Sequence, residues 1–292
     1  MALDPHWPRA SAWLGASCAD ARLSVVGAPF NRSVTPGRYD LGPDAIYKAL
    51  DRYSDAIFAG SGSLYDIPVR DFGDVDADEE DWTVSVPGLV EALQFEAGVI
   101  LGGDNGATRA GVHALAEARQ IPISRIGLIT IDAHLDLRDL DGGAMNGNPI
   151  RGLLEDGMDP AHIVQIGLQD FANSSYYMNV GLDAGIRAIP LDQRPLPEVF
   201  EEELGLAERV DVLYVDFDLD VMDRAFVPGC PGARPGGITP REARQIARIA
   251  GRSQVAVMDL VEFDPSKDVN DQTALIAAAC LLEFAAGMRD RR

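Results

Sequence analysis

The chain has 292 residues, of which 47% are hydrophobic and 24% are charged, so it is long enough to bury a sizeable core and too apolar for wholesale disorder. Its 46 acidic and 25 basic residues give a formal net charge of −21. This charge argues against nucleic acid and against an anionic membrane surface as partners, because both would repel the protein.

The cysteines also limit the cellular compartment and the kind of metal site that the protein can have. Cys18, Cys230 and Cys280 form no C-x-x-C pair, which is typical of free thiols in a reducing cytoplasm and gives no cysteine-based zinc site. The first twenty residues lack the basic flank and apolar core of a signal peptide, and no run of about 18 apolar residues indicates a membrane span. We therefore expect a cytoplasmic protein with no membrane segment.

Strand-like and helix-like segments alternate along the chain after an N-terminal arm, residues 1–20, that we expect to be irregular. The predicted strands are Leu23–Gly27, Ile67–Asp71, Gly98–Gly103, Ile126–Ile129, His162–Gly167, Ile186–Ile189, Val212–Phe217 and Val255–Val261. The predicted helices lie near residues 43–53, 86–96, 107–119, 149–155 and 174–184, and begin again at Thr239 and near Gln272. This alternation predicts one α/β domain, residues 21–292, with a mostly parallel eight-stranded sheet between helices.

Polar side chains gather directly after several of these strands. They are Asp104 and Asn105, then Asp132, His134 and Asp136, then Asp218 and Asp220, and finally Glu262. The carboxyl ends of parallel strands meet at one edge of an open sheet, which is where binding sites form. The i, i+2 spacing within two of these groups would point their side chains to one side of an extended backbone.

Four carboxylates and one imidazole could therefore bind two divalent cations: Asp132, His134, Asp136, Asp218 and Asp220. Carboxylate oxygen favours manganese or magnesium over zinc, and two cations that share a water lower its pKa enough to activate it as a nucleophile. An isolated D-x-H-x-D is more often a solvated turn, but a second cluster after another apolar strand favours a metal site. Asp216, two residues before the second cluster, is either a supporting residue or an unusual ligand.

These segments together resemble the ureohydrolase superfamily of arginase, agmatinase and formimidoylglutamase. The resemblance covers nearly the whole chain from about Leu23. Its motifs are Val26-Gly27-Ala28-Pro29-Phe30, Gly42-Pro43-Asp44-Ala45-Ile46, Gly102-Gly103-Asp104-Asn105, Asp132-Ala133-His134-Leu135-Asp136, Asp218-Leu219-Asp220-Val221-Met222-Asp223 and Val261-Glu262. It implies the three-layer arginase-like α/β fold, with a central, mostly parallel eight-stranded sheet.

The resemblance also implies a dimanganese site. Asp132 and Asp218 would bridge the two ions, His134 and Asp220 would complete the coordination of one ion, and Asp136 would complete that of the other. Two Mn²⁺ per chain are thus expected.

The implied catalytic residues are Asp136, which would hydrogen-bond the nucleophile and relay its proton, and Glu262, which would face the cationic amidine-like group of the substrate. Two positions depart from the usual family pattern. The family usually has histidine where this chain has Asn105, whose neutral carbonyl oxygen should leave that metal weak or absent. Asn146 likewise stands where arginases and agmatinases commonly have histidine, and it cannot shuttle a proton.

Both departures resemble the formimidoylglutamase branch, as does the segment Gly167–Ser174, which contains Asn173. The implied reaction is hydrolysis of N-formimidoyl-L-glutamate to L-glutamate and formamide, a step of histidine catabolism. Because this substrate carries two carboxylates, Arg151 and Arg109 are candidate contacts, together with Asn146 and Asn173. Each arginine has an alternative, purely structural interpretation.

Two other functions stay open. One is hydrolysis of a guanidino compound such as agmatine or guanidinobutyrate, with release of urea, against which Asn146 argues mildly. The other is a metal-depleted, non-catalytic subunit of a ureohydrolase assembly, against which the five remaining ligands argue. For an active enzyme, the resemblance implies a small-molecule amidine substrate and a homo-oligomer, a trimer or a hexamer.

Overall fold

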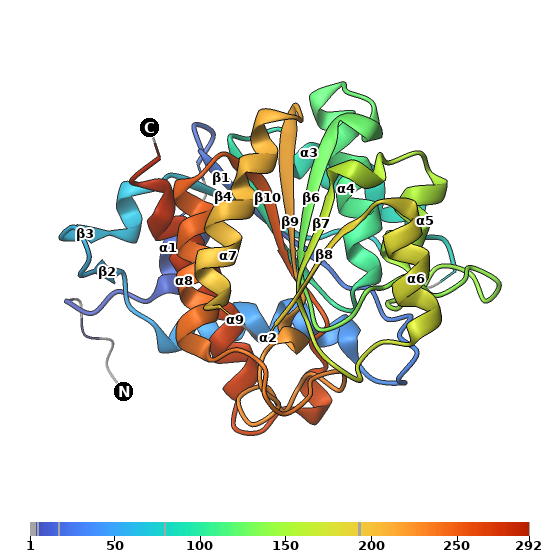
Figure 1. Cartoon of the computed structure of the whole chain (residues 1–292). Coiled ribbons are helices and arrows are strands. Elements are labelled where there is room, and N and C mark those ends of the chain that lie inside the picture. Colours follow the sequence, from blue (N-terminus) through green and yellow to red (C-terminus); the bar gives the residue numbers. More distant parts are fainter. Residues whose placement is uncertain (1–3, 5, 17, 79, 192–193, 292) are drawn as a thin grey trace.

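A computed structural model describes residues 4, 6–16, 18–78, 80–191 and 194–291. Its centre is an eight-stranded sheet in which every paired strand is parallel (Figure 1). The strands are β1 (Leu23–Ala28), β4 (Val69–Asp74), β5 (Ala97–Gly102), β6 (Ile126–Ile131), β7 (Ile163–Leu168), β8 (Arg187–Pro190), β9 (Val212–Phe217) and β10 (Val255–Leu260). Their order across the sheet is β4-β1-β5-β10-β9-β6-β7-β8.

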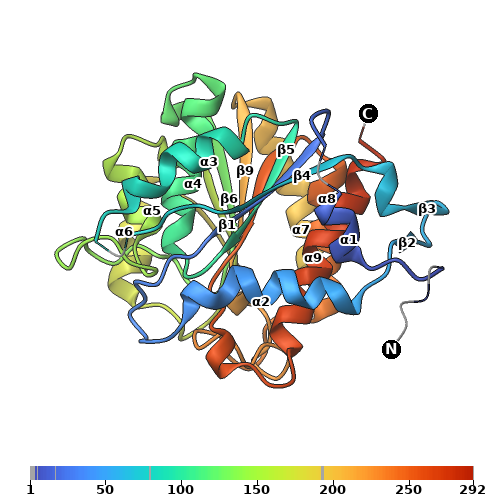
Figure 2. The ribbon, with the colours of Figure 1, turned by 180° about the vertical axis from the view of Figure 1, so that it is seen from behind.

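Helices cover both faces of this sheet. One layer contains α3 (Val86–Ala92), α4 (Gly106–Arg119), α5 (Pro149–Glu155) and α6 (Ser175–Ala184). The other contains α1 (Ala10–Gly15), α2 (Gly42–Ala49), α7 (Leu196–Glu203), α8 (Pro240–Arg252) and α9 (Gln272–Met288). Figure 2 shows the second layer from behind, with α2 crossing the lower ends of the strands. Each layer packs its own cluster of buried apolar side chains against the sheet, so the fold has the three layers that the sequence predicts.

The burial of the central strands explains their composition. All six residues of β5, β6 and β10 are buried, because helices cover both faces of a parallel sheet. Such strands are continuous apolar runs, which is why these central strands were predictable from the sequence. Polar residues within these runs, such as Asp259 in β10, therefore need a partner inside the protein.

Three parts of the chain differ from the sequence-based expectation. The arm expected to be irregular contains α1, whose buried Trp13 donates a hydrogen bond from Nε1 to the Ile67 carbonyl oxygen over 3.0 Å; residues 1–3, 5 and 17 of that arm lie outside the described residues. Helix α7 and the two-stranded hairpin of β2 (Ala56–Ile57) and β3 (Gly62–Ser63) were not predicted. All are short, and short elements depend on tertiary packing more than on local sequence.

Among the described residues, none of the helices is both long and apolar enough to cross a lipid bilayer. Cys18, Cys230 and Cys280 are all free thiols.

The polar residues singled out in the sequence follow four adjacent strands, β5, β10, β9 and β6. Gly103 holds two of the loops at this edge together: its N–H donates to the Ala28 carbonyl oxygen over 2.9 Å, and its own carbonyl oxygen accepts from the N–H of Glu262 over 2.8 Å. A Cβ at Gly103 would lie 2.0 Å from the carbonyl oxygen of Phe30. Only glycine fits here without a shift of backbone.

Gly103→Ala should therefore lower the free energy of unfolding by about 2 kcal/mol, because a methyl group is forced against backbone atoms that cannot move aside like a side chain. Gly205→Ala is the matched control, since a Cβ at Gly205 meets nothing within 4 Å. Urea denaturation of both variants measures the difference. Equal stability of the two would show that the loops at this edge are not packed as described.

Candidate metal centre

Two short loops, one after β6 and one after β9, are built alike. The Asp132 carboxylate accepts a hydrogen bond from the His134 N–H over 2.7 Å, and the Asp218 carboxylate accepts one from the Asp220 N–H over 2.7 Å. In each loop the aspartate carboxylate thus accepts a hydrogen bond from the backbone N–H two residues later, as in an Asx turn. The extended backbone expected from the sequence is wrong here, although the side chains do converge.

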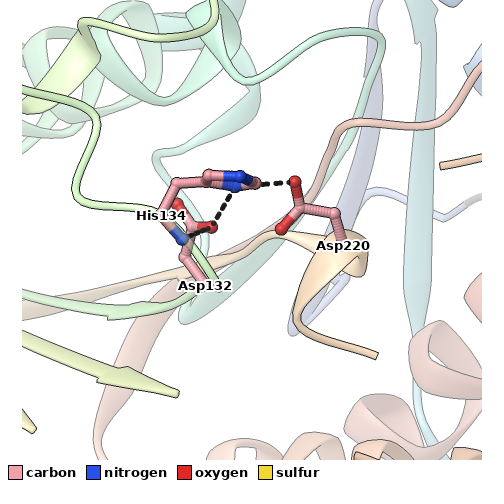
Figure 3. A group of neighbouring side chains, drawn as sticks. All are labelled: Asp132, His134 and Asp220. Atoms are coloured by element: carbon pink, nitrogen blue, oxygen red, sulfur yellow. Dashed lines mark hydrogen bonds and ion pairs between the residues drawn. The ribbon is translucent and has the colours of Figure 1, made fainter. Parts of the chain in front are cut away.

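The first group of side chains is Asp132, His134 and Asp220 (Figure 3). His134 Nδ1 lies 2.9 Å from Asp220 Oδ2 and 3.5 Å from Asp132 Oδ1, and one potential ligand atom from each residue lies within 4.8 Å of the others. Asp220 Oδ1 is buried and makes no hydrogen bond to any described residue. Gly232 closes over the group, where a Cβ would lie 2.0 Å from Asp220 Oδ2.

The second group shares Asp132 with the first and adds Asp136 and Asp218, again within 4.8 Å. Asn105 lies against this group: its Nδ2 donates to Asp136 Oδ2 over 2.7 Å and to Asp218 Oδ2 over 3.3 Å. Asp136 has φ of 50°, a left-handed backbone conformation that is uncommon for residues other than glycine. The structure therefore brings together all six residues that the sequence analysis selected as metal ligands.

Glu262 completes the site from the end of β10. Its Oε2 accepts a hydrogen bond from the Asn105 N–H over 3.1 Å, and its Oε1 accepts one from Asn146 Nδ2 over 2.9 Å. Asn146 is itself fixed, because its Oδ1 accepts from the Val34 N–H over 2.9 Å. Glu262 also has a positive φ, 65°. Asn146 thus orients Glu262, which the sequence did not indicate.

Burial and crowding raise the pKa values of these carboxylates. Burial, with a contribution from Asp220, raises the pKa of Asp132 to about 7. The pKa values of Asp136, Asp218 and Glu262 are raised well above their usual range, in each case mainly by burial and then by neighbouring carboxylates. Charging such a group in a low-dielectric site is costly without a cation to balance it.

His134 and Asp220 form an ion pair within the cluster. Burial alone would lower the pKa of His134, but Asp220 and Asp132 outweigh it and raise that pKa to about 12. Burial alone would raise the pKa of Asp220, but the charge and hydrogen bond of His134 hold it below the usual range. A metal ion bound here would take the place of the imidazole proton as the balancing positive charge. The donor set, mainly carboxylate oxygens with one imidazole, fits manganese.

One predicted substrate contact, Arg109, is occupied by other interactions. Both Oδ1 and Oδ2 of Asp156 accept hydrogen bonds from Arg109 over 2.7 Å, and the Arg109 guanidinium lies 4.7 Å from the centre of the Trp82 ring. His113 Nε2 lies 2.8 Å from the same carboxylate. These contacts support the structural interpretation of Arg109 instead of a role in substrate binding.

Asn173 and Arg151 lie near the metal-ligand loop in different ways. Asn173 accepts from the Leu135 N–H over 2.8 Å and donates to the Ala133 carbonyl oxygen over 3.0 Å, so it holds the loop backbone in place. Arg151 pairs with Glu155 one turn along α5, in a half-exposed position. Because Glu155 is exposed, the Arg151 guanidinium could leave it for another carboxylate.

Sequence reasoning missed Arg32, which lines a small cavity together with Asp104, Gly106 and Met145. Its Nη2 donates to the Gly142 carbonyl oxygen over 2.7 Å. The only signal in the sequence was its place just after β1, at the edge where the other polar residues gather. Asp216, left open above, is fully buried and belongs to neither group of ligand atoms.

Comparison with known proteins decides the family. The model of the Arginase family matches residues 21–287. This protein belongs to the arginase family. The formimidoylglutamase of Halalkalibacterium halodurans is 34% identical over 280 residues, which cover 91% of this chain and 86% of that protein.

Two solved structures of this arginase-family fold are similar to the chain. The formimidoylglutamase of Bacillus subtilis superposes with a TM-score of 0.89 at 25% identity, covering 100% of this chain and 95% of that one. A formiminoglutamase of Trypanosoma cruzi, described with Mn²⁺, superposes with a TM-score of 0.85 at 20% identity, covering 98% and 100%. The predicted resemblance and the arginase-like fold are both confirmed.

The raised pKa values predict an unusual dependence of stability on pH. A carboxylate with a raised pKa in the folded state binds its proton more tightly there than in the unfolded chain, so the stability that it contributes is lost as pH rises from about 4 through about 7. In the presence of a chelator, the unfolding temperature should therefore fall between about pH 5 and about pH 8. Added Mn²⁺ should raise it most at the higher pH, because the metal needs deprotonated ligands.

Differential scanning calorimetry measures both curves. Asp218→Asn should flatten the chelator curve and weaken the response to Mn²⁺. A manganese response that is equally large at both pH values, or equal in Asp218→Asn, would count against a buried carboxylate centre.

Proposed function

We propose that this protein is a manganese-dependent hydrolase that converts N-formimidoyl-L-glutamate to L-glutamate and formamide. The observation that carries this proposal is the arrangement around Glu262, whose two oxygens are held by Asn105 and Asn146 beside two overlapping groups of metal-binding side chains. The similarity to formimidoylglutamases over 91% of the chain supports the choice of substrate. The manganese described for the Trypanosoma cruzi protein agrees with the donor set.

Asp132, His134 and Asp220 would hold one ion, and Asp132, Asp136 and Asp218 the other, with Asn105 beside the second. When bound, two such ions supply a water whose pKa is low enough for nucleophilic attack near neutral pH. Their stoichiometry of two per chain is part of the proposal.

The residues of this chain would supply the remaining chemistry. Glu262, fixed by its two hydrogen bonds, would face the positively charged formimidoyl group. Burial raises the pKa of Glu262, and the positive charge of the substrate would favour its ionised form. Asp136 would accept a proton from the attacking water and deliver it to the glutamate nitrogen as the C–N bond breaks.

The acidic protein still has to bind a substrate with two carboxylates. We propose Arg32, at the cavity beside Asp104 and Gly106, as a contact in addition to Arg151. Both guanidinium groups have partners that a substrate carboxylate could replace or extend, namely the Gly142 carbonyl oxygen and Glu155. Arg109 is not part of this proposal.

A cytoplasmic location, a role in histidine catabolism and a homotrimeric or homohexameric assembly are also proposed, on the similarity to the family. The proposed location agrees with the three free thiols.

A substrate panel tests the function. Purified protein with Mn²⁺ should release glutamate from N-formimidoyl-L-glutamate and release no urea from agmatine or guanidinobutyrate. Glu262→Gln should lower kcat/KM by about 100-fold or more, because the neutral amide cannot balance the cationic group. Glu198→Gln, on an exposed turn of α7, is the control and should leave kcat/KM unchanged.

Each alternative has its own outcome in this panel. Urea release without glutamate release would favour the guanidino hydrolase. No product from any substrate, less than one metal ion per chain, and activity that appears only in Asn105→His would favour the non-catalytic subunit.

A further inference from the structure

A buried hydroxyl lies directly behind Asn105. Thr108, on the first turn of α4 and completely buried, places its Oγ1 2.6 Å from Asn105 Oδ1 and 2.9 Å from Asp259 Oδ2. The hydroxyl has one proton and can donate it to only one of these oxygens at a time. The contact joins the metal centre to a carboxylate that belongs to neither group of ligand atoms.

The Asp259 carboxylate is fixed from other directions. Its Oδ2 accepts a hydrogen bond from the Tyr214 hydroxyl over 2.7 Å, and its Oδ1 accepts one from the Phe217 N–H over 3.0 Å. Asp259, Tyr214 and Phe217 are all fully buried. The carboxylate therefore stays in place whatever Thr108 does, and its Oδ2 always faces the Thr108 hydroxyl.

The Asn105 amide has two possible orientations. In this structure Nδ2 points to Asp136 and Asp218, and Oδ1 points to Thr108. An amide N–H cannot bind a cation, so an ion held by Asp136 and Asp218 requires the carbonyl oxygen on that side. Turning the amide over presents Oδ1 to the ion and brings Nδ2 to the Thr108 hydroxyl.

We propose that Thr108 is a positioning residue that lets Asn105 serve as a metal ligand. In the orientation of this structure, Thr108 donates its hydroxyl proton to Asn105 Oδ1. In the turned orientation, Thr108 accepts from Asn105 Nδ2 and donates the same proton to Asp259 Oδ2. Thr108 is hydrogen-bonded to the Asn105 amide in both orientations, and no proton enters or leaves the site.

This inference rests on the proposed metal centre. It explains how the ion beside Asn105, which is expected to be the more weakly bound, is held. A side chain without a hydroxyl would leave a buried Asn105 N–H unpaired in the turned orientation, and such a group is costly. The cation on the Asn105 side would then bind more weakly. The cation held by Asp132, His134 and Asp220 would be unaffected, because none of these residues contacts Thr108 among the hydrogen bonds of the described chain.

Thr108→Val keeps the shape of the side chain and removes the hydroxyl, whereas Thr108→Ser keeps the hydroxyl. Calorimetric titration of Mn²⁺ into metal-stripped protein should show the weaker site about 10-fold weaker or more in Thr108→Val, with the tighter site unchanged. Thr108→Ser should bind like the wild type. If Thr108→Val does not yield folded protein, Thr108→Ala replaces it with the same expectation.

A double-mutant cycle separates this role from a general structural one. In an Asn105→Ala background, Thr108→Val should not change manganese affinity, because the amide that Thr108 supports is gone. Equal weakening of both sites, equal weakening in Thr108→Ser, or the same loss in the Asn105→Ala background would overturn the proposal. Failure of the wild type to bind a second ion would instead refute the proposed two-metal centre.

Discussion

The structure depends on one electrostatic constraint, the concentration of carboxylates in a buried site at the end of the sheet. The charges of its residues repel each other in a medium that screens them poorly, so burial raises most of their pKa values. One imidazole offsets only part of this charge. A fold that keeps such a cluster loses stability through it, and a bound divalent cation would balance the charge.

The backbone around the cluster is correspondingly specialised. Asp136 and Glu262, the two proposed catalytic residues, both have a positive φ, and Gly103 and Gly232 lie where no other side chain would fit. The Asn146 amide donates a hydrogen bond to Glu262. The Asn173 amide is hydrogen-bonded to the backbone of the metal-ligand loop. Asn146, which stands where the usual family pattern has histidine, is therefore a fixed part of the site and has a structural task that needs no proton transfer.

Much of this was predictable from the sequence, because buried parallel strands are apolar runs and the polar residues after them gather at one edge. The ligand groups followed from that placement, and only the local geometry differed, as Asx turns replaced an extended backbone. Contacts between distant segments were not predictable. Thr108 and Asp259 are 151 residues apart in the sequence. They come into contact because β10, which contains Asp259, pairs with β5, and α4, which contains Thr108, follows β5. The ion-pair partner of Arg109 is Asp156, at the end of another helix. Because this pairing could not be recognised from the sequence, Arg109 was a candidate substrate contact.

We propose that this chain works with two manganese ions although Asn105 stands where the family usually has histidine. The most direct test is to titrate Mn²⁺ into metal-stripped protein while following glutamate release from N-formimidoyl-L-glutamate. The rate should rise until two equivalents per chain are bound, with the second binding more weakly than the first. A maximal rate at one equivalent, or full activity in the presence of a chelator, would contradict the account.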